Sequence, residues 1–268
     1  MFYVLLAVSA VITAAGFYRF VYFISIGYAF SVVGLAIAML IGFGASLTLP
    51  VAILLAIVAV YAARLGIFVV IREYKNVAYR KVLDEASTGF KKIPFFVKIP
   101  IWIFCSVLYV MQVSPVFFRV QNGLQNGLQL AYYRWLYAGI CLVAAGFLLQ
   151  TVADAQKNKA KKANPKTFCR QGLFKVVRCP NYFGEILVWT GVFLSSMPCL
   201  TGWFQIAFSV VGYIGLVYVM FGSTRRLELR QNKNYGSDPA YQEYGRTTPI
   251  LIPMLPLYSV ADWTWLGK

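Results

Sequence analysis

The sequence predicts an all-α protein, a polytopic membrane bundle of about seven transmembrane helices. Three observations support this prediction: 60% of the 268 residues are hydrophobic, only 13% are charged, and the mean hydropathy is +0.67. A disordered chain would combine low hydrophobicity with high charge, and an ordinary water-soluble domain has about 25% charged residues. The surplus of apolar side chains therefore has to face lipid, and we expect an integral membrane protein.

Apolar runs of about 20 residues, the length that crosses the hydrocarbon core, place the helices in order. They cover residues 2–17, 23–44, 48–71, 94–114, 132–153, 182–200 and 202–223. No basic segment precedes the first run, which we interpret as a retained helix rather than a cleaved signal. The longest polar stretch, residues 155–180, is followed by further apolar runs, so residues 1–268 are predicted to form a single integral membrane domain.

Basic residues gather in alternate polar segments and predict the orientation. Lys and Arg are frequent after the third, fifth and seventh runs, whereas the opposite side receives only Arg119 and Arg134. The positive-inside rule then places the C-terminus in the cytosol, matrix or stroma and the N-terminus across the membrane. Several membranes are compatible with the sequence: the endoplasmic reticulum or another internal membrane, a bacterial inner membrane, or the mitochondrial inner membrane. A repeated Gln-Asn-Gly-Leu at 121–128 predicts a turn-rich loop on the less charged side.

A formal net charge of +16 would suggest nucleic-acid binding in a soluble protein, but in a membrane protein it suggests orientation by the positive-inside rule. We assign it to membrane orientation and to an anionic cofactor, and we expect no nucleic-acid partner. Histidine is absent, which excludes Ser-His-Asp triads, Cys-His dyads and His-ligated metals. The five cysteines form no CxxC pair, so we expect neither a disulfide framework nor a metal site.

The few ionisable residues at membrane depth are candidate site residues. Asp154 lies at the inner end of the fifth run, Glu185 near the start of the sixth, and Arg64 within the third. An ionisable group there costs about 2.5–3.5 kcal/mol, so a site is the default interpretation, with snorkelling as the alternative. Steps of three and four put Asp154, Lys157 and Lys161 on one helix face, which suits a ligand with hydroxyls and phosphates. The alternative is a solvated basic end of a helix.

Pro180 is a suitable first residue for the sixth helix, whose amino end would then face the basic side and could bind phosphate. Asn181 and Glu185 share a face of this helix, and the alternative is a buried polar pair. A third basic cluster contains Arg225 and Arg226. No G-x-G-x-x-G fingerprint occurs, so any nicotinamide cofactor would be held without a Rossmann fold.

Several motifs together resemble one family. They are Asp154-Ala-Gln-Lys157, Gly172-Leu-Phe, Arg178-Cys-Pro-Asn-Tyr-Phe-Gly-Glu185, Tyr241-Gln-Glu-Tyr244-Gly-Arg-Thr-Thr-Pro-Ile-Leu-Ile-Pro253 and Tyr61-Ala-Ala-Arg64. This set resembles the steroid 5-alpha-reductase family, in its bacterial and protist-type branch, with residues 150–253 as the C-terminal cofactor-binding region. The resemblance implies a seven-helix membrane reductase that transfers hydride from NADPH to the β-carbon of an enone in a lipid or steroid-like substrate.

The resemblance also implies roles for particular residues. Tyr61 matches the tyrosine that hydrogen-bonds the substrate carbonyl, and a neutral phenol, with a pKa of about 10, can donate to a developing enolate. The alternative for Tyr61 is an ordinary packed aromatic. With Lys157 from the helix-face argument, the expected cofactor-binding residues are Asp154, Lys157, Lys161, Asn181, Glu185, Arg225, Arg226 and Tyr244.

Two departures from the family pattern leave other functions open. Cys179 stands where the signature has His, and residues 1–72 contain no acid, where animal steroid reductases carry a glutamate that assists carbonyl binding. Tyr28 or Ser31 could substitute for it. One alternative is a catalytically inactive structural subunit of a larger membrane complex. Another is a methyltransferase of the isoprenylcysteine type that uses S-adenosylmethionine, although Asp154-x-x-Lys157 and Glu185 favour a reductase.

Overall fold

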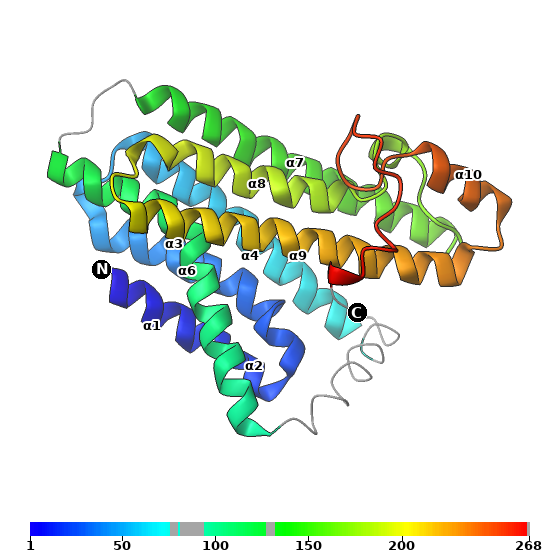
Figure 1. The fold of residues 1–268 in the computed structure, drawn as a ribbon, viewed down its shortest axis with the longest axis horizontal. Helices are drawn as coiled ribbons and strands as arrows, with labels where there is room; N and C mark the ends of the chain where they lie inside the picture. Colours follow the sequence, from blue (N-terminus) through cyan, green and yellow to red (C-terminus); the bar gives the residue numbers. More distant parts are fainter. Residues whose placement is uncertain (76–79, 81–93, 127–131, 267–268) are drawn as a thin grey trace. The chain divides into compact units, whose positions relative to one another are not determined.

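The computed structural model describes residues 1–75, 80, 94–126 and 132–266, and the regular elements of this part of the chain are all helical (Figure 1). Contacts within the chain define two compact units. Unit 1 comprises Met1–Ile140 and Val192–Tyr213, and unit 2 comprises Cys141–Gly191 and Ile214–Lys268. The prediction of a single integral domain stays a prediction, and each unit is described below by itself.

Unit 1 is built around α3. Its helices are α1 (Phe2–Thr13), α2 (Ala15–Tyr18), α3 (Ile26–Phe43), α4 (Leu49–Lys75) and α6 (Phe95–Asn126), with short 3-10 turns at Phe20–Phe23 and Gly44–Ser46. α3 packs against α1, α4 and α6. These helices are apolar on most of their surface, so polar side chains join them only at a few points. One such point is the Ser9 hydroxyl, which donates to the Ser106 carbonyl at 2.9 Å.

Arg119, which the sequence assigns to the less charged side, is buried in unit 1. Its Nη1 donates to the Ser195 carbonyl at 2.7 Å, and the neighbouring Asn122 amide donates to the Cys199 carbonyl at 2.6 Å. The cation thus satisfies a carbonyl in the last turn of α8 (Pro180–Ser196), where the helix dipole favours positive charge, and the amide satisfies one in the 3-10 turn Met197–Cys199 that follows. This contact gives Arg119 a structural role.

Unit 2 contains the segments that the sequence marks as cofactor-binding. It holds most of α7 (Tyr133–Ala163) and α8, the carboxyl-terminal part of α9 (Trp203–Tyr235), and α10 (Pro239–Thr247). α7 and α8 cross with their backbones in contact, since a Cβ added to Gly146 would lie 2.5 Å from the Gly184 carbonyl oxygen. Pro180 is the first residue of α8, as predicted, and Asp238 caps α10 by accepting from the Ala240 amide at 2.9 Å.

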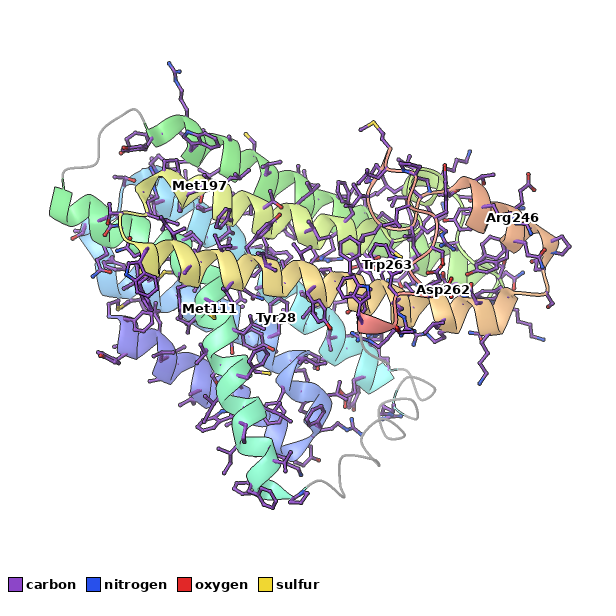
Figure 2. All side chains as sticks on the ribbon, in the orientation of Figure 1. Tyr28, Met111, Met197, Arg246, Asp262 and Trp263 are labelled. Atoms are coloured by element: carbon purple, nitrogen blue, oxygen red, sulfur yellow. The ribbon has the colours of Figure 1, made fainter. Side chains whose placement is uncertain are left out.

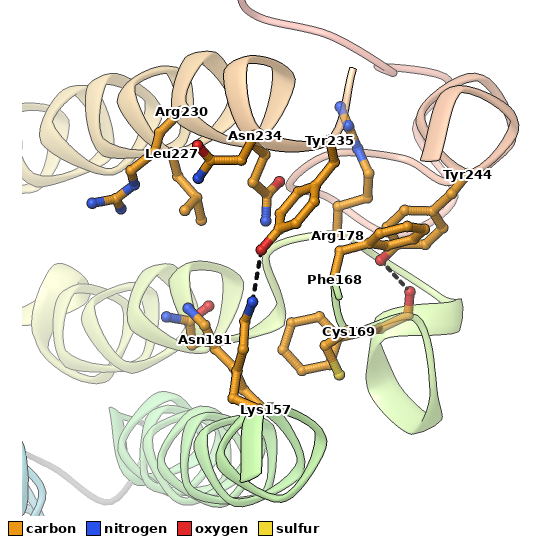
Figure 3. Close-up of a pocket in the computed structure, with 13 residues that line it drawn as sticks. Lys157, Phe168, Cys169, Arg178, Asn181, Leu227, Arg230, Asn234, Tyr235 and Tyr244 are labelled. Atoms are coloured by element: carbon orange, nitrogen blue, oxygen red, sulfur yellow. Dashed lines mark hydrogen bonds between the residues drawn. The ribbon is translucent and has the colours of Figure 1, made fainter. Parts of the chain in front are cut away.

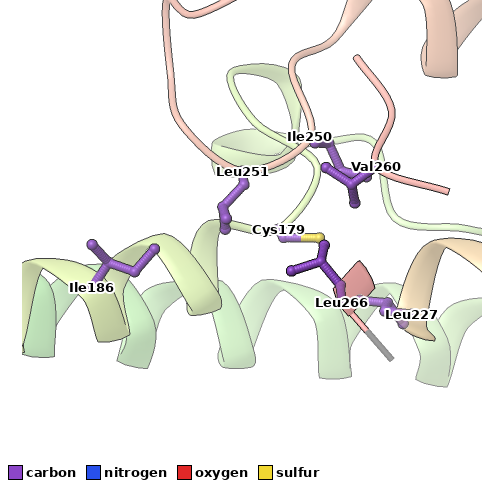
Figure 4. Packing of buried hydrophobic residues seen from close by; sticks show 7 residues of the cluster. All are labelled: Cys179, Ile186, Leu227, Ile250, Leu251, Val260 and Leu266. Carbon is purple, nitrogen blue, oxygen red and sulfur yellow. The ribbon is translucent and has the colours of Figure 1, made fainter. Parts of the chain in front are cut away.

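In a small hydrophobic cluster, the segment after α10 (residues 250–266) packs against α8 and α9. Its buried members are Cys179, Ile186, Leu227, Ile250, Leu251, Val260 and Leu266 (Figure 4). Partly buried aromatic residues, among them Phe221 and Trp263, pack against it. The cluster therefore lies where the first turns of α8 meet the middle of α9.

Five described helical segments are long and apolar enough to cross a membrane. They are Phe20–Ser46, Leu49–Lys75, Phe95–Gly123, Tyr133–Ala163 and Trp203–Tyr235. Phe2–Tyr18 is a shorter apolar helix, and α8 has 17 residues. An integral membrane protein is thus supported, while the count of seven spans and the orientation stay predictions.

Candidate functional site

A cavity of about 240 Å³ lies within unit 2, between the polar end of α7, the start of α8 and the polar half of α9 (Figure 3). The segment between α7 and α8 and one residue of α10 complete its walls. The lining residues are Lys157, Lys161, Phe168, Cys169, Phe174, Arg178, Asn181, Leu227, Arg230, Gln231, Asn234, Tyr235 and Tyr244. Four residues of the predicted cofactor set, Lys157, Lys161, Asn181 and Tyr244, therefore meet at one cavity.

The cavity carries positive charge. Lys157, Lys161, Arg178 and Arg230 line it, and none of its lining residues is Asp or Glu. Cations gathered from separate segments of the chain around one hollow give a positive potential, which favours a ligand with several negative charges. Phosphate groups meet this requirement.

The ammonium group of Lys161 forms hydrogen bonds within the protein and has a structural role at the cavity wall. Its Nζ donates to the Pro165 carbonyl at 3.1 Å, to the Thr167 carbonyl at 2.6 Å and to the Tyr235 hydroxyl at 2.7 Å. An ammonium has three protons, so these three acceptors use all of them. Lys161 thus ties the segment after α7 to the end of α9 and adds charge to the wall.

An aromatic wall faces the cations. The rings of Phe168 and Tyr244 are stacked with centroids 5.4 Å apart, and the Tyr244 hydroxyl donates to the Phe174 carbonyl at 2.6 Å. Burial raises the pKa of Tyr244 well above its usual range, so this phenol stays a neutral donor at physiological pH. Aromatic faces of this kind can stack on the planar ring of a base.

Asn181 brings an unsatisfied acceptor to the first turn of α8. Its Oδ1 is buried and has no hydrogen-bond partner among the described residues. A buried acceptor without a partner costs about 1–3 kcal/mol, which a ligand donor would recover. The backbone of this turn is less available than the sequence suggests, because the Tyr182 amide donates to the Cys179 carbonyl. Side chains therefore supply most of the polar contacts that the cavity can offer here.

Arg178 is fixed at the cavity wall by a buried ion pair. Its Nη2 lies 2.7 Å from Oε1 of Glu228 on α9, and the other carboxylate oxygen of Glu228 accepts from the Val260 amide at 2.9 Å. Arg178 also lines a second, more open hollow of about 360 Å³, together with Tyr241, Arg246 and other residues. Its buried Nε has no partner in the described part of the chain.

The other four residues of the predicted cofactor set do not line the cavity. Asp154 is buried one helical turn before Lys157. Glu185 is buried and accepts from Gln150 Nε2 at 2.6 Å and from Trp189 Nε1 at 3.2 Å. Arg225 is buried and donates through Nε to the Ala261 carbonyl at 2.9 Å, whereas Arg226 is exposed and donates to the Ser223 hydroxyl.

The expected substrate-binding tyrosine lies in unit 1. Tyr61 on α4 is fully buried, and its hydroxyl is 3.5 Å from that of Tyr28 on α3. Ser31, one turn along α3 from Tyr28, has a buried hydroxyl with no hydrogen-bond partner among the described residues. The structure thus brings Tyr61 together with Tyr28, one of the two hydroxyl residues that could replace the family's early glutamate.

The sequence interpretation expected α9 to contribute Arg225 and Arg226 but missed the residues of α9 that line the cavity. Arg230, Gln231, Asn234 and Tyr235 line the cavity although they lie beyond the last predicted apolar run. The polar stretch after Glu228 could have identified these residues, because it continues the helix α9 to Tyr235 instead of ending it. Cys179, the departure from the signature histidine, is buried in the hydrophobic cluster, and burial raises the pKa of its thiol to about 12.

Comparison with known proteins gives one family and no named relative. No curated protein and no solved structure matches the chain. A family model described as "Protein of unknown function (DUF1295)" matches residues 11–248. Because this match covers most of the 268 residues, the chain belongs to the DUF1295 family.

Proposed function

We propose that the protein is an NADPH-dependent membrane reductase that acts on a conjugated C=C bond, an enone, in a lipid or steroid-like substrate. The observation that carries this proposal is the cavity of unit 2, which joins four cations, an aromatic wall and the unpaired Asn181 oxygen. The resemblance of residues 150–253 to the C-terminal region of steroid 5-alpha-reductases supports the same assignment. At about 240 Å³ the cavity fits one phosphorylated half of a dinucleotide.

The charge of the cavity favours NADPH over S-adenosylmethionine. NADPH carries several phosphate charges, whereas S-adenosylmethionine carries a sulfonium cation, an ammonium group and a single carboxylate. A wall with Lys157, Arg178 and Arg230 and without a lining carboxylate would attract the first ligand and repel the sulfonium of the second. We therefore rank the reductase above the methyltransferase.

The residues of the chain have distinct roles under this proposal. Lys157 and Arg230 would bind phosphate oxygens, the Phe168–Tyr244 pair would stack on a base, and Asn181 would accept from an amide or hydroxyl donor. When bound, NADPH would supply the hydride. The buried Tyr61 hydroxyl would donate to the enone carbonyl, where negative charge develops. Apolar surroundings would keep water away from this group.

A matched pair of lysines on α7 tests cofactor binding. Lys157 lines the cavity, whereas Lys159 on the same helix is exposed and does not. In nanodiscs, Lys157→Gln is expected to weaken NADPH binding about tenfold, the effect of losing one charge-assisted hydrogen bond, and Lys159→Gln to leave it nearly unchanged. NADPH should also slow alkylation of Cys169, which lines the cavity. Equal effects of the two lysine variants, or binding of S-adenosylmethionine alone, would contradict the proposal.

Turnover is tested separately by oxidation of NADPH with a panel of steroid and polyprenoid enones. Tyr61→Phe is expected to lower kcat by about 100-fold, the effect of removing one donor to a developing oxyanion. Full turnover in this variant would remove Tyr61 from the mechanism. Saturable NADPH binding without turnover, with stably co-purifying subunits, would instead support an inactive structural subunit.

A further inference from the structure

Residues 250–266, the segment after α10, present two different faces. One face is buried: Ile250, Leu251, Val260 and Leu266 belong to the hydrophobic cluster on α8 and α9 (Figure 4). The other face exposes large apolar side chains to the surroundings. They are Met254, Leu255, Tyr258 and Trp265. A water-soluble surface rarely gathers such residues in one short segment.

The segment is held firmly against α9. Arg225 donates to the Ala261 carbonyl at 2.9 Å, and Glu228 accepts from the Val260 amide at 2.9 Å. Gly222 allows the Leu266 carbonyl oxygen to approach, because a Cβ at this position would lie only 3.2 Å from it. The outward face is therefore displayed by a fixed part of unit 2.

The tip of the segment points an apolar side chain away from the protein. Met254 is 97% exposed and adopts a positive φ of 64°, a backbone conformation that is rare for a residue with a side chain. Pro253 and Pro256 flank it and stiffen the loop, and the Ile250 amide donates to the Leu257 carbonyl at 2.8 Å across its base. The tip thus presents an apolar side chain outward from a strained backbone conformation.

Aromatic contacts fix the position of this segment along α9. Trp263 is stacked on Phe221 with ring centroids 6.0 Å apart, Trp265 is stacked on Trp263 at 5.7 Å, and Tyr218 donates to the Trp265 carbonyl at 2.9 Å. Figure 2 labels Trp263 beside α9. Arg226, two turns after Tyr218, is exposed. The stack thus lies where the sequence of α9 changes from apolar to charged residues, the position at which Trp and Tyr are enriched in membrane-spanning helices.

We propose that residues 253–265 form a membrane-interface anchor whose partner is the lipid leaflet around the carboxyl-terminal end of α9. Trp265 and Tyr258 lie at the headgroup level, and Met254 and Leu255 enter the acyl region. Two observations favour lipid over a protein partner. The anchor packs against α9, a helix long and apolar enough to cross a membrane, and the exposed Arg226 beside it complements anionic headgroups.

Labelling of the full-length protein tests the anchor. In a variant with Cys141 and Cys169 replaced by Ala, the remaining cysteines are buried, so Met254→Cys can be labelled selectively with the fluorophore NBD. Ser237→Cys, exposed in the polar turn after α9, is the matched control. In nanodiscs of phosphatidylcholine and phosphatidylglycerol, we expect dithionite to reduce the label at 254 several-fold more slowly than the label at 237. Lipid with a doxyl group at acyl carbon 5 should quench only the label at 254.

Each outcome decides the proposal. Equal dithionite rates at the two positions would show that the tip lies in water and would overturn it. Protection from dithionite without quenching by the doxyl lipid would mean that protein, such as a second copy of the chain, covers the tip, and would overturn it as well. Replacing Trp265 by Ser should raise the dithionite rate at 254. No readout involves NADPH, so the result is independent of the proposed enzymatic function.

Discussion

Ser31 stands apart from the other hydroxyl residues of the described helices. Ser106 donates to the Trp102 carbonyl and Thr190 to the Ile186 carbonyl, the usual way in which a helix satisfies a buried hydroxyl. The Ser31 hydroxyl has no partner in the described part of the chain, although it is fully buried. An unsatisfied group that persists in this position is a candidate for binding an acceptor on the substrate.

The variant Ser31→Ala separates binding from stability. Removal of an unpaired buried hydroxyl is expected to raise the free energy of unfolding by about 1 kcal/mol. If the hydroxyl binds the enone oxygen, the same variant raises KM while leaving NADPH affinity unchanged. Thermal unfolding in detergent and steady-state kinetics measure the two effects. A destabilised variant with unchanged KM would mean that Ser31 only packs.

Tyr244 gives unit 2 a pH dependence on the alkaline side. Burial raises the pKa of Tyr244, so the folded state holds this proton more tightly than the unfolded state, in which the pKa is about 10. The stabilisation is complete below pH 10 and is lost as pH rises toward the pKa of the folded state. We expect the thermal midpoint to fall above about pH 10. Tyr244→Phe should reduce this slope while lowering stability at neutral pH through loss of the bond to Phe174.

At the scale of elements, Glu228 joins three segments. Its carboxylate pairs with Arg178 before α8 and accepts from Val260 in the segment after α10. Both side chains of the pair are almost fully buried, with 3% and 4% exposed. Glu228→Gln leaves the Arg178 charge without a counterion and is expected to cost about 3 kcal/mol of stability.

Chemical or thermal unfolding of Glu228→Gln measures this loss. Glu243→Gln is a suitable control, because Glu243 is exposed on α10. A similar small effect in both variants would show that Arg178 finds another partner.

The sequence predicted which segments are helical better than it predicted where they end. Pro180 at the start of α8 is confirmed because proline has a strong local preference for the first turn. α7 and α9 extend about three turns beyond the expected apolar runs, to Ala163 and Tyr235, since Lys, Arg, Gln and Asn can continue a helix after it leaves the membrane. The turn-rich loop expected at 121–128 is wrong in its first part: α6 continues to Asn126, and the Asn122 side chain hydrogen-bonds to Cys199 and Gln205. Residues 127–128 lie outside the described residues.

The sequence predicted only some of the residues that line the cavity. Lys157, Asn181 and Tyr244 line the cavity, and the sequence identified all three, through helical spacing or a local motif. Glu185 looked equally suitable, yet the close approach of Gly146 and Gly184 brings Gln150 within hydrogen-bonding distance of it. Such a contact depends on the distance between two backbones, which no pattern in one sequence specifies.

At the scale of the whole molecule, orientation is open to direct measurement. The charge distribution predicts that the N- and C-termini lie on opposite sides, with the C-terminus in the cytosol, matrix or stroma. Either five or seven crossings would give this result, whereas six would place both termini on one side. Protease protection of terminal tags in sealed vesicles checks the prediction. Detection of both termini from the same side would contradict it and would direct attention to α8 or to Phe2–Tyr18 as a segment that does not cross.

The contact between Glu228 and the Val260 amide has a consequence for biogenesis. Arg178 and α8 are synthesised before residues 257–266, so the start of the cavity wall is made ahead of the segment that completes its support. Newly made chains must therefore pass through a stage in which the Cys179–Leu227 surface is uncovered.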